Sequence, residues 1–185
     1  MKKTIYILTI FFITTFVSSV APSISHAQPY GKGVYNAIVP YGSQTSLSIA
    51  TNATNGNINI PITPTTSGVQ ATGINTITVT STDVKGYKLY IRALSNTNMN
   101  NLGALLPASA NGTPAALAMN TWGYNLDASS NFTGITLSDI LIRSISVPAS
   151  TGDITNVTYG IKLDLAKPAG NYVASVVYTA VPQTD

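Results

Sequence analysis

The chain has 185 residues, of which only 8% are charged, and its nine basic residues outnumber its six acidic residues. Lys2 and Lys3 supply two of those nine, so the rest of the chain is nearly neutral, and a basic surface for nucleic acid or anionic membrane is excluded. Cysteine is absent, so the fold must be stable without disulfides.

Residues 1–27 have the pattern of a secretory signal peptide. The two lysines precede an apolar run from Ile5 to Val20, and Ser25-His26-Ala27 places small residues where signal peptidase reads them before Gln28. The alternative is a retained membrane anchor, but the run is slightly shorter than the roughly 18 apolar residues that a spanning helix needs. We therefore expect a cleaved, secreted chain without a transmembrane segment.

Residues 28–43 are rich in glycine, proline and tyrosine and are predicted to form an extended leader or an edge strand. Tyr30, Tyr35 and Tyr41 within it are candidate assembly residues, because they can pack on the domain or on a neighbouring molecule. The remainder, residues 44–185, has the length of a single domain with its own core.

Short apolar segments separated by turn residues follow the leader. Leu47–Ala50 and Asn57–Ile62 are strand candidates, and Asn55-Gly56 between them is a hairpin signal. Ile74–Ser81 and Gly86–Leu94 alternate apolar with polar residues and are predicted to pair with each other.

The alternation then stops. The segment 95–120 is rich in asparagine and alanine and contains Pro107 and Pro114, so we expect a long loop that is either functional or flexible. Asn98 and Asn101 within this loop are candidate ligand-binding residues.

Trp122 and Tyr124 come next, and their rings could stack on a sugar. The alternative, which the sequence favours, is that the single tryptophan anchors the core, as it does in many β-sandwiches. A further strand is predicted from Ile140 to Val147, where Pro148 ends it.

The last third of the chain has the clearest strand pattern. Apolar residues alternate with polar or small ones from Val157 to Leu165, as in a strand with one buried face. Lys167–Asn171 is a turn by composition and is predicted to join this strand to a second one in a hairpin. The second strand, Tyr172–Val181, is apolar on both faces, with Tyr172 placed to act as a corner tyrosine. Together the segments predict an all-β antiparallel sandwich, Ig-like or jelly-roll-like, with roughly eight strands and one long insert.

The side chains from which most catalytic sites are built are missing. His26 is the only histidine and lies in the predicted signal peptide, and the chain has neither glutamate nor cysteine. A Ser-His-Asp triad, a Cys-His dyad and an HExxH zinc site are therefore excluded. The carboxylates lie at predicted turns or on polar strand faces, so we expect no enzymatic activity, cofactor or metal. They are Asp83, Asp127, Asp139, Asp153, Asp164 and Asp185.

Several short motifs occur in succession along the chain: Ile77-Thr78-Val79, Gly86-Tyr87-Lys88-Leu89, Thr121-Trp122-Gly123-Tyr124, Asp153–Lys162, Pro168-Ala169-Gly170-Asn171-Tyr172 and Val177-Tyr178-Thr179-Ala180. This succession is similar to that of small secreted surface proteins of Gram-positive-like bacteria and, more distantly, of WxL cell-wall-binding domains. The resemblance implies a β-rich module that attaches non-covalently to peptidoglycan, although Tyr178-Thr179-Ala180 stands where that family has Trp-x-Leu.

These observations favour a non-enzymatic secreted protein of the cell surface with an envelope-structural or adhesive role, including non-covalent wall attachment. One alternative is a pilus-like subunit that assembles by strand addition through residues 28–43. Another is a glycan-binding module or carbohydrate-active enzyme. The corresponding partners are a cell-wall polymer, a surface glycan of a host or neighbouring cell, or further copies of the chain.

Overall fold

The computed structural model describes residues 6–13 and 45–183 and arranges them in two β-sheets that pack face to face. Within these residues no helix is long and apolar enough to cross a membrane. The strands are β1 (Tyr6–Ile13), β2 (Ser46–Thr51), β3 (Asn57–Ile62), β4 (Val69–Thr82), β5 (Gly86–Ala93), β6 (Met99–Asn101), β7 (Ala104–Leu106), β8 (Thr121–Asn125), β9 (Ile140–Ile145), β10 (Asp153–Leu163) and β11 (Tyr172–Gln183).

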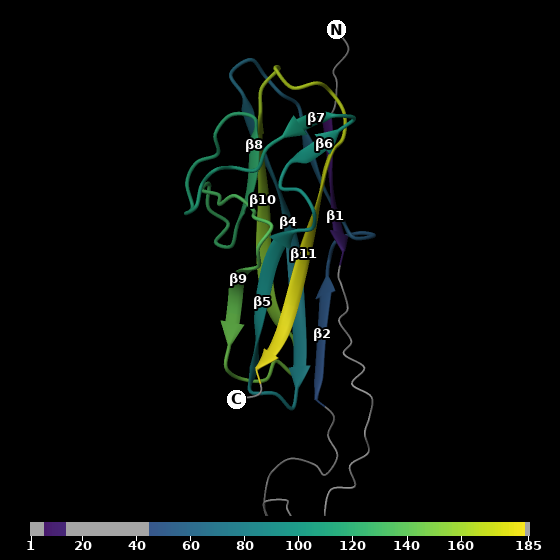
Figure 1. The fold of residues 1–185 in the computed structure, drawn as a ribbon, viewed down its shortest axis with the longest axis vertical. Helices are drawn as coiled ribbons and strands as arrows, with labels where there is room; N and C mark the ends of the chain where they lie inside the picture. The colour runs from purple at the N-terminus through teal and green to yellow at the C-terminus, as the bar shows by residue number, and fades with distance from the viewer. Residues whose placement is uncertain (1–5, 14–44, 184–185) are drawn as a thin grey trace, which may run out of the picture.

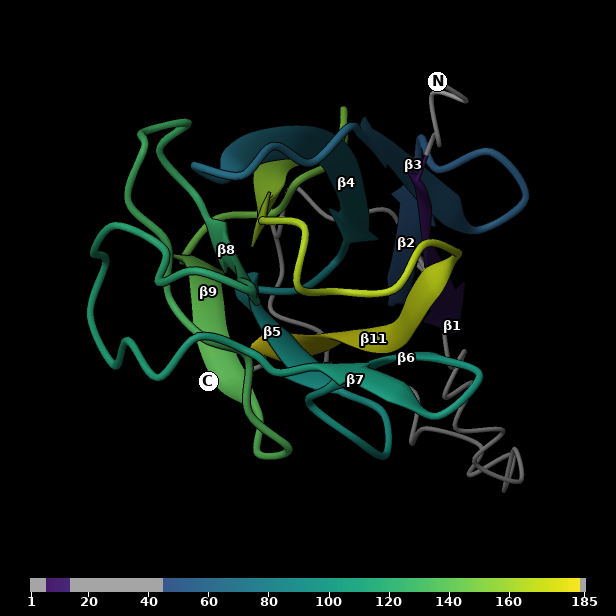
Figure 2. The same cartoon turned by 90° about the horizontal axis from the view of Figure 1, so that it is seen from above.

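The larger sheet has seven strands and the smaller sheet four. The larger sheet has the order β3-β1-β11-β5-β9, with β6 paired to β11 and β7 to β6, and the smaller has the order β2-β4-β10-β8. Seen from above, β5 and β11 lie in one layer and β4 lies in the other (Figure 2). The predicted all-β antiparallel sandwich is confirmed, with the parallel pair β1–β11 as an exception to its antiparallel pairing.

The core lies between the two sheets and follows the alternation of the sequence. On β10, Val157, Tyr159, Ile161 and Leu163 are at most 1% exposed, as the period of two predicts. Leu165 continues the pattern in the sequence but is 56% exposed, because β10 ends at Leu163 and the chain turns away.

The predicted strand pairs are wrong, although most of the predicted strands are present. β4 and β5 lie in different sheets, where β4 pairs with β2 and β10, and β5 pairs with β9 and β11. The chain likewise crosses from the smaller to the larger sheet between β10 and β11, so the last third is a corner of the sandwich and not a hydrogen-bonded hairpin (Figure 1). The crossing lets both strands bury one face against the opposite sheet.

The turn predicted at Asn55-Gly56 is present, but it also connects the two sheets. Both residues have positive φ, 51° and 74°, as a type I′ turn requires. β2 and β3 on either side belong to the smaller and the larger sheet, respectively.

The segment 95–120 is not the plain loop that its composition predicts. It forms the short hairpin β6–β7, which joins the larger sheet through pairing of Asn100 with Val173. It also encloses Trp122, whose Nε1 donates a hydrogen bond to the carbonyl oxygen of Thr97 at 2.9 Å. The insert therefore closes one side of the core.

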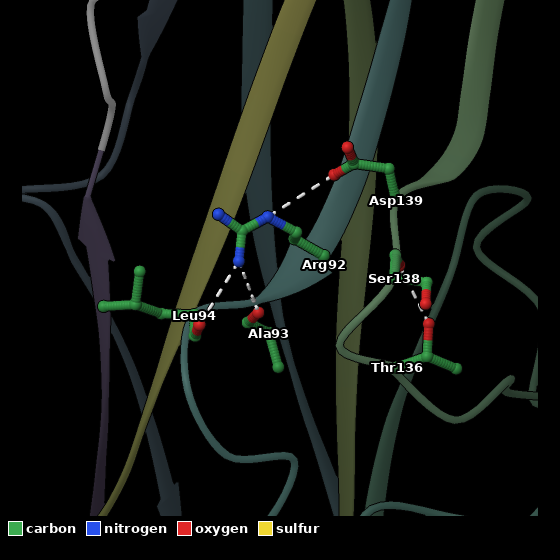
Figure 3. Close-up of polar contacts among 6 residues, drawn as sticks. All are labelled: Arg92, Ala93, Leu94, Thr136, Ser138 and Asp139. Carbon is green, nitrogen blue, oxygen red and sulfur yellow. Dashed lines mark hydrogen bonds and ion pairs between the residues drawn. The ribbon is translucent and has the colours of Figure 1, made fainter.

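An ion pair joins the end of β5 to the segment before β9. Arg92 Nε lies 3.4 Å from Asp139 Oδ1, and its Nη1 donates to the carbonyl oxygens of Ala93 and Leu94, both at 3.2 Å (Figure 3). The Thr136 hydroxyl donates to the Ser138 carbonyl oxygen nearby and tightens the same turn (Figure 3). These contacts position β9 beside β5.

Candidate functional site

β1 occupies an internal position of the larger sheet, although the sequence predicts that this segment belongs to a cleaved signal peptide. It pairs antiparallel with β3, from Tyr6 opposite Ile62 to Phe11 opposite Asn57. It pairs parallel with β11, from Leu8 opposite Tyr172 to Ile13 opposite Val177 (Figure 1). We call the position between β3 and β11 the strand slot.

Both walls of the strand slot present buried apolar side chains toward the core. On β3 they are Ile58, Ile60 and Ile62, which are 8%, 1% and 4% exposed. On β11 they are Tyr172, Ala174 and Val176, at 2%, 5% and 0%. An occupant of the slot therefore needs apolar residues at every second position, in step with these walls.

The other edge of β11 is already paired. β5 lies along Val176–Gln183, and β6 reaches Val173. β1 is the partner of the first half of β11 on the remaining edge, and it is the partner of β3. Without β1, two strand edges with their backbone N–H and C=O groups would be left without these partners, which is unfavourable for a sheet.

Gly73 of β4 sets how closely β3 approaches the smaller sheet. A Cβ at this glycine would lie 2.7 Å from Ile60 Cγ1 and 2.9 Å from Ile58 Cγ2, both shorter than van der Waals contact. Because Gly73 has no side chain, Ile58 and Ile60 of β3 can pack closely against β4.

The candidate glycan platform is not available in this structure. Trp122 is fully buried and Tyr124 is 4% exposed, so neither ring offers a free face to a sugar. The Trp122 and Tyr159 ring centroids lie 6.4 Å apart, and the tryptophan is a core anchor, which was the alternative role for it. Burial is decided by the insert 95–120, which the composition of the segment did not predict to pack.

The two candidate asparagines in the insert are partly buried and do not converge on a common site with the aromatic pair. Asn101 Nδ2 donates to the Ala169 carbonyl oxygen at 3.2 Å and so holds the turn before β11. The backbone N–H of Asn98 donates to Asn96 Oδ1 in a local turn. Tyr30, Tyr35 and Tyr41 lie outside the described residues.

Corner and core tyrosines have structural contacts. The Tyr172 hydroxyl donates to the Pro168 carbonyl oxygen at 3.0 Å, which confirms the predicted corner tyrosine.

The hydroxyl oxygens of Tyr159 and Tyr178 lie 2.5 Å apart in the core and link β10 of the smaller sheet to β11 of the larger. Burial raises the pKa of both phenols, so the pair stays neutral and stabilises the sheet contact.

Asp153 is the most strongly connected carboxylate in the described part of the chain. It accepts hydrogen bonds from Arg143 Nε and Nη2, each at 2.8 Å, and from the Tyr87 hydroxyl at 2.6 Å. Arg143 holds the pKa of Asp153 below its usual value, while burial and the neighbouring carboxylate raise the pKa of Tyr87 to about 12. The three residues come from both sheets and form a clamp at one end of the sandwich.

The other carboxylates also support local structure. Asp127 accepts a hydrogen bond from the Ser129 backbone, and Asp164 accepts from the Ala166 backbone and from Asn120, and these bonds lower both carboxylate pKa values. Among the described residues, His, Cys, Asp and Glu side chains form no group of three that could hold a metal ion. Asp127 and Asp164 therefore stabilise local turns by accepting hydrogen bonds.

The strand slot is the feature that sequence analysis missed. The sequence of Tyr6–Ile13 is typical of a strand, because β-branched and aromatic residues predominate, but a continuous apolar run also fits a signal peptide.

Comparison with known proteins does not identify a family for this chain, because it matches no family model and no curated protein.

Proposed function

We propose that this chain is a secreted, non-enzymatic structural protein of the bacterial cell surface, whose larger sheet is completed by a strand from another chain. The observation that carries the proposal is the position of β1, which fills an internal place in the sheet yet belongs to the predicted signal peptide. Cleavage after Ala27 separates that strand from the domain and opens the strand slot.

An open strand slot would bind an added strand through both of its edges. Backbone hydrogen bonds to β3 and β11 would supply affinity, and the apolar walls would select an alternating sequence. The proposal also agrees with a mature chain of low charge that lacks histidine, cysteine and glutamate. It favours the pilus-like alternative within the broader envelope-structural role.

The proposal is tested with the full chain carrying a specific protease site inserted after Ala27. The uncut protein, with β1 in place, is expected to be monomeric by size-exclusion chromatography with light scattering. After cutting, mild denaturant is used to release residues 1–27, and the domain is expected to form oligomers when the denaturant is removed. The same protein treated identically but left uncut is the control.

A cut protein that has lost residues 1–27 and remains a monomer with the melting temperature of the uncut protein would refute strand addition in trans. Glycan hydrolysis that is lost in an Asp153→Asn variant, with the fold preserved, would contradict the non-enzymatic part of the proposal.

A further inference from the structure

We infer that the strand slot is filled by residues 35–41 of a second copy of this chain, running in the direction of β1 and linking copies head to tail. The inference rests on the proposed function and names its partner. It follows from the register of the slot, the sequence of the leader and the length of chain between the leader and β2.

The register defines which positions of an occupant must be apolar. Tyr6, Leu8 and Ile10 of β1 are level with the buried Ile62, Ile60 and Ile58 of β3. Leu8, Ile10 and Phe12 are level with the buried residues of the other wall, Tyr172, Ala174 and Val176. An occupant residue at the level of Tyr6, Leu8, Ile10 or Phe12 therefore lies beside buried side chains of the walls, and we call these four levels the core-facing positions of the slot.

The leader reproduces this spacing. With Tyr35 at the position of Tyr6, the core-facing positions receive Tyr35, Ala37, Val39 and Tyr41. All four are apolar or aromatic, and an aromatic residue stands at the first and last positions in both segments. The other face receives Asn36, Ile38 and Pro40. The alternation required by the walls is thus met by the leader.

Pro40 is compatible with this register because of where it falls. It takes the place of Phe11, which is opposite Asn57 in the last pair that the slot makes with β3 and opposite Ser175 of β11, where the pairing continues to Ile13. A proline lacks the backbone donor, and it is tolerated on the β3 side, where the pairing ends. Gly42 follows immediately and allows the chain to leave the sheet.

Chain length favours a second copy over the chain's own leader. Tyr41 and Ser46 are separated by five residue steps, which span at most about 18 Å. The slot lies beyond the far end of β2 (Figure 1), so the chain's own leader would have to run the length of β2, about 17 Å, and cross between sheets about 10 Å apart. The straight path of about 20 Å exceeds that reach.

A shift by two residues would lengthen the connection but would weaken the fit. It places Gly33 at the first core-facing position and removes Tyr41 from the last. A leader from another copy has no such restriction, because its connection leads away to its own domain. Each copy would then donate one leader and accept one, and this heterologous contact builds an open chain of subunits.

Engineered cysteines test both the register and the identity of the donor, since the chain has no cysteine of its own. Ile38 would take the place of Thr9, opposite Asn59, on the face that points away from the core. In the Ile38→Cys/Asn59→Cys variant of the protease-site protein, cutting, strand release and mild oxidation should give a ladder of covalent multimers on a non-reducing gel. Val39→Cys/Asn59→Cys is the matched control, with side chains on opposite faces, and should give no ladder.

Each outcome decides between occupants. A covalent monomer would show that the chain's own leader fills the slot and would overturn the inference. Oligomers without any cross-link would also overturn it, because another segment would then fill the slot, but the proposed function would stand. A cut protein that has lost residues 1–27 and stays a monomer with the melting temperature of the uncut protein would refute both.

A second pair of variants separates assembly from folding. Val39→Asp places a charge at a core-facing position and should abolish the oligomers, whereas Ile38→Asp makes the same change on the outer face and should leave most of them. Both uncut proteins should melt alike, since β1 fills the slot before cutting. Equal loss of oligomers in the two variants, or no loss in either, would overturn the inference.

Discussion

Replacement of Gly73 by alanine tests whether the β3 wall of the strand slot depends on close packing against β4. The added Cβ would lie 2.7 Å from Ile60 Cγ1, whereas carbon atoms prefer about 3.5–4.0 Å, so β3 would have to move outward by about 1 Å. Such overpacking costs about 1–3 kcal/mol, and the lower entropy of the unfolded alanine chain offsets about 0.4–1 kcal/mol of it. We expect a net loss of about 1–2 kcal/mol in the free energy of unfolding.

The measurement is urea denaturation of the uncut full chain at neutral pH, with Gly112→Ala as the matched control. A Cβ at Gly112 meets no atom within 4 Å, so this variant should be neutral or slightly stabilised. In the cut protein, Gly73→Ala should also reduce the yield of oligomers, because the displaced wall pairs poorly with an incoming strand. Equal unfolding free energies for the two variants would refute the packing argument.

Three further predictions concern the contacts that hold the sandwich together. Asp153→Asn should cost about 1–2 kcal/mol in the free energy of unfolding at pH 7. Because Arg143 lowers the folded pKa of this carboxylate, the ion pair contributes fully above the unfolded pKa of about 3.9 and is lost as the pH falls through the folded value, so urea denaturation should show the variant and the wild type converging in stability as the pH is lowered. Tyr172→Phe removes the corner hydrogen bond and should lower the unfolding free energy by about 1 kcal/mol in urea; an unchanged value would contradict its role. Gly160→Ala brings a Cβ into steric overlap with the Phe132 ring and should lower the free energy of unfolding by about 1–3 kcal/mol, measured by thermal melting, with Gly112→Ala again as the neutral control.

The local pattern of the sequence predicted strands well where one face is buried and the other is polar. Val157, Tyr159 and Ile161 are in the core as their alternation indicates, and the Tyr172 corner was recognised from its place after a turn. The opposite face of β10 is also partly covered. Gly160 lies against Phe132 there, and this contact depends on a loop about thirty residues earlier in the chain, which alternation in β10 cannot reveal.

The candidate site was harder to predict, because it depends on which strands become neighbours. A place in a long insert suggests Asn98 and Asn101 as ligand-binding residues, and aromatic rings suggest Trp122 and Tyr124. The insert packs over Trp122 and removes the ring from solvent, so the tryptophan has the core role and not the ligand-binding role. The strand slot, in contrast, joins β3 and β11, which are separated by about 110 residues and are brought together only by the folded sheet.

The sequence by itself determined the fold class of the protein: alternating apolar residues and frequent turn residues specify an all-β body. Only the tertiary structure decided the pairing, because a strand with one apolar face is equally suited to either sheet until its neighbours are fixed. That choice placed β4 and β5 in opposite layers and left room between β3 and β11 for one more strand. The apolar run of Tyr6–Ile13 occupies that place because it satisfies two open strand edges at once.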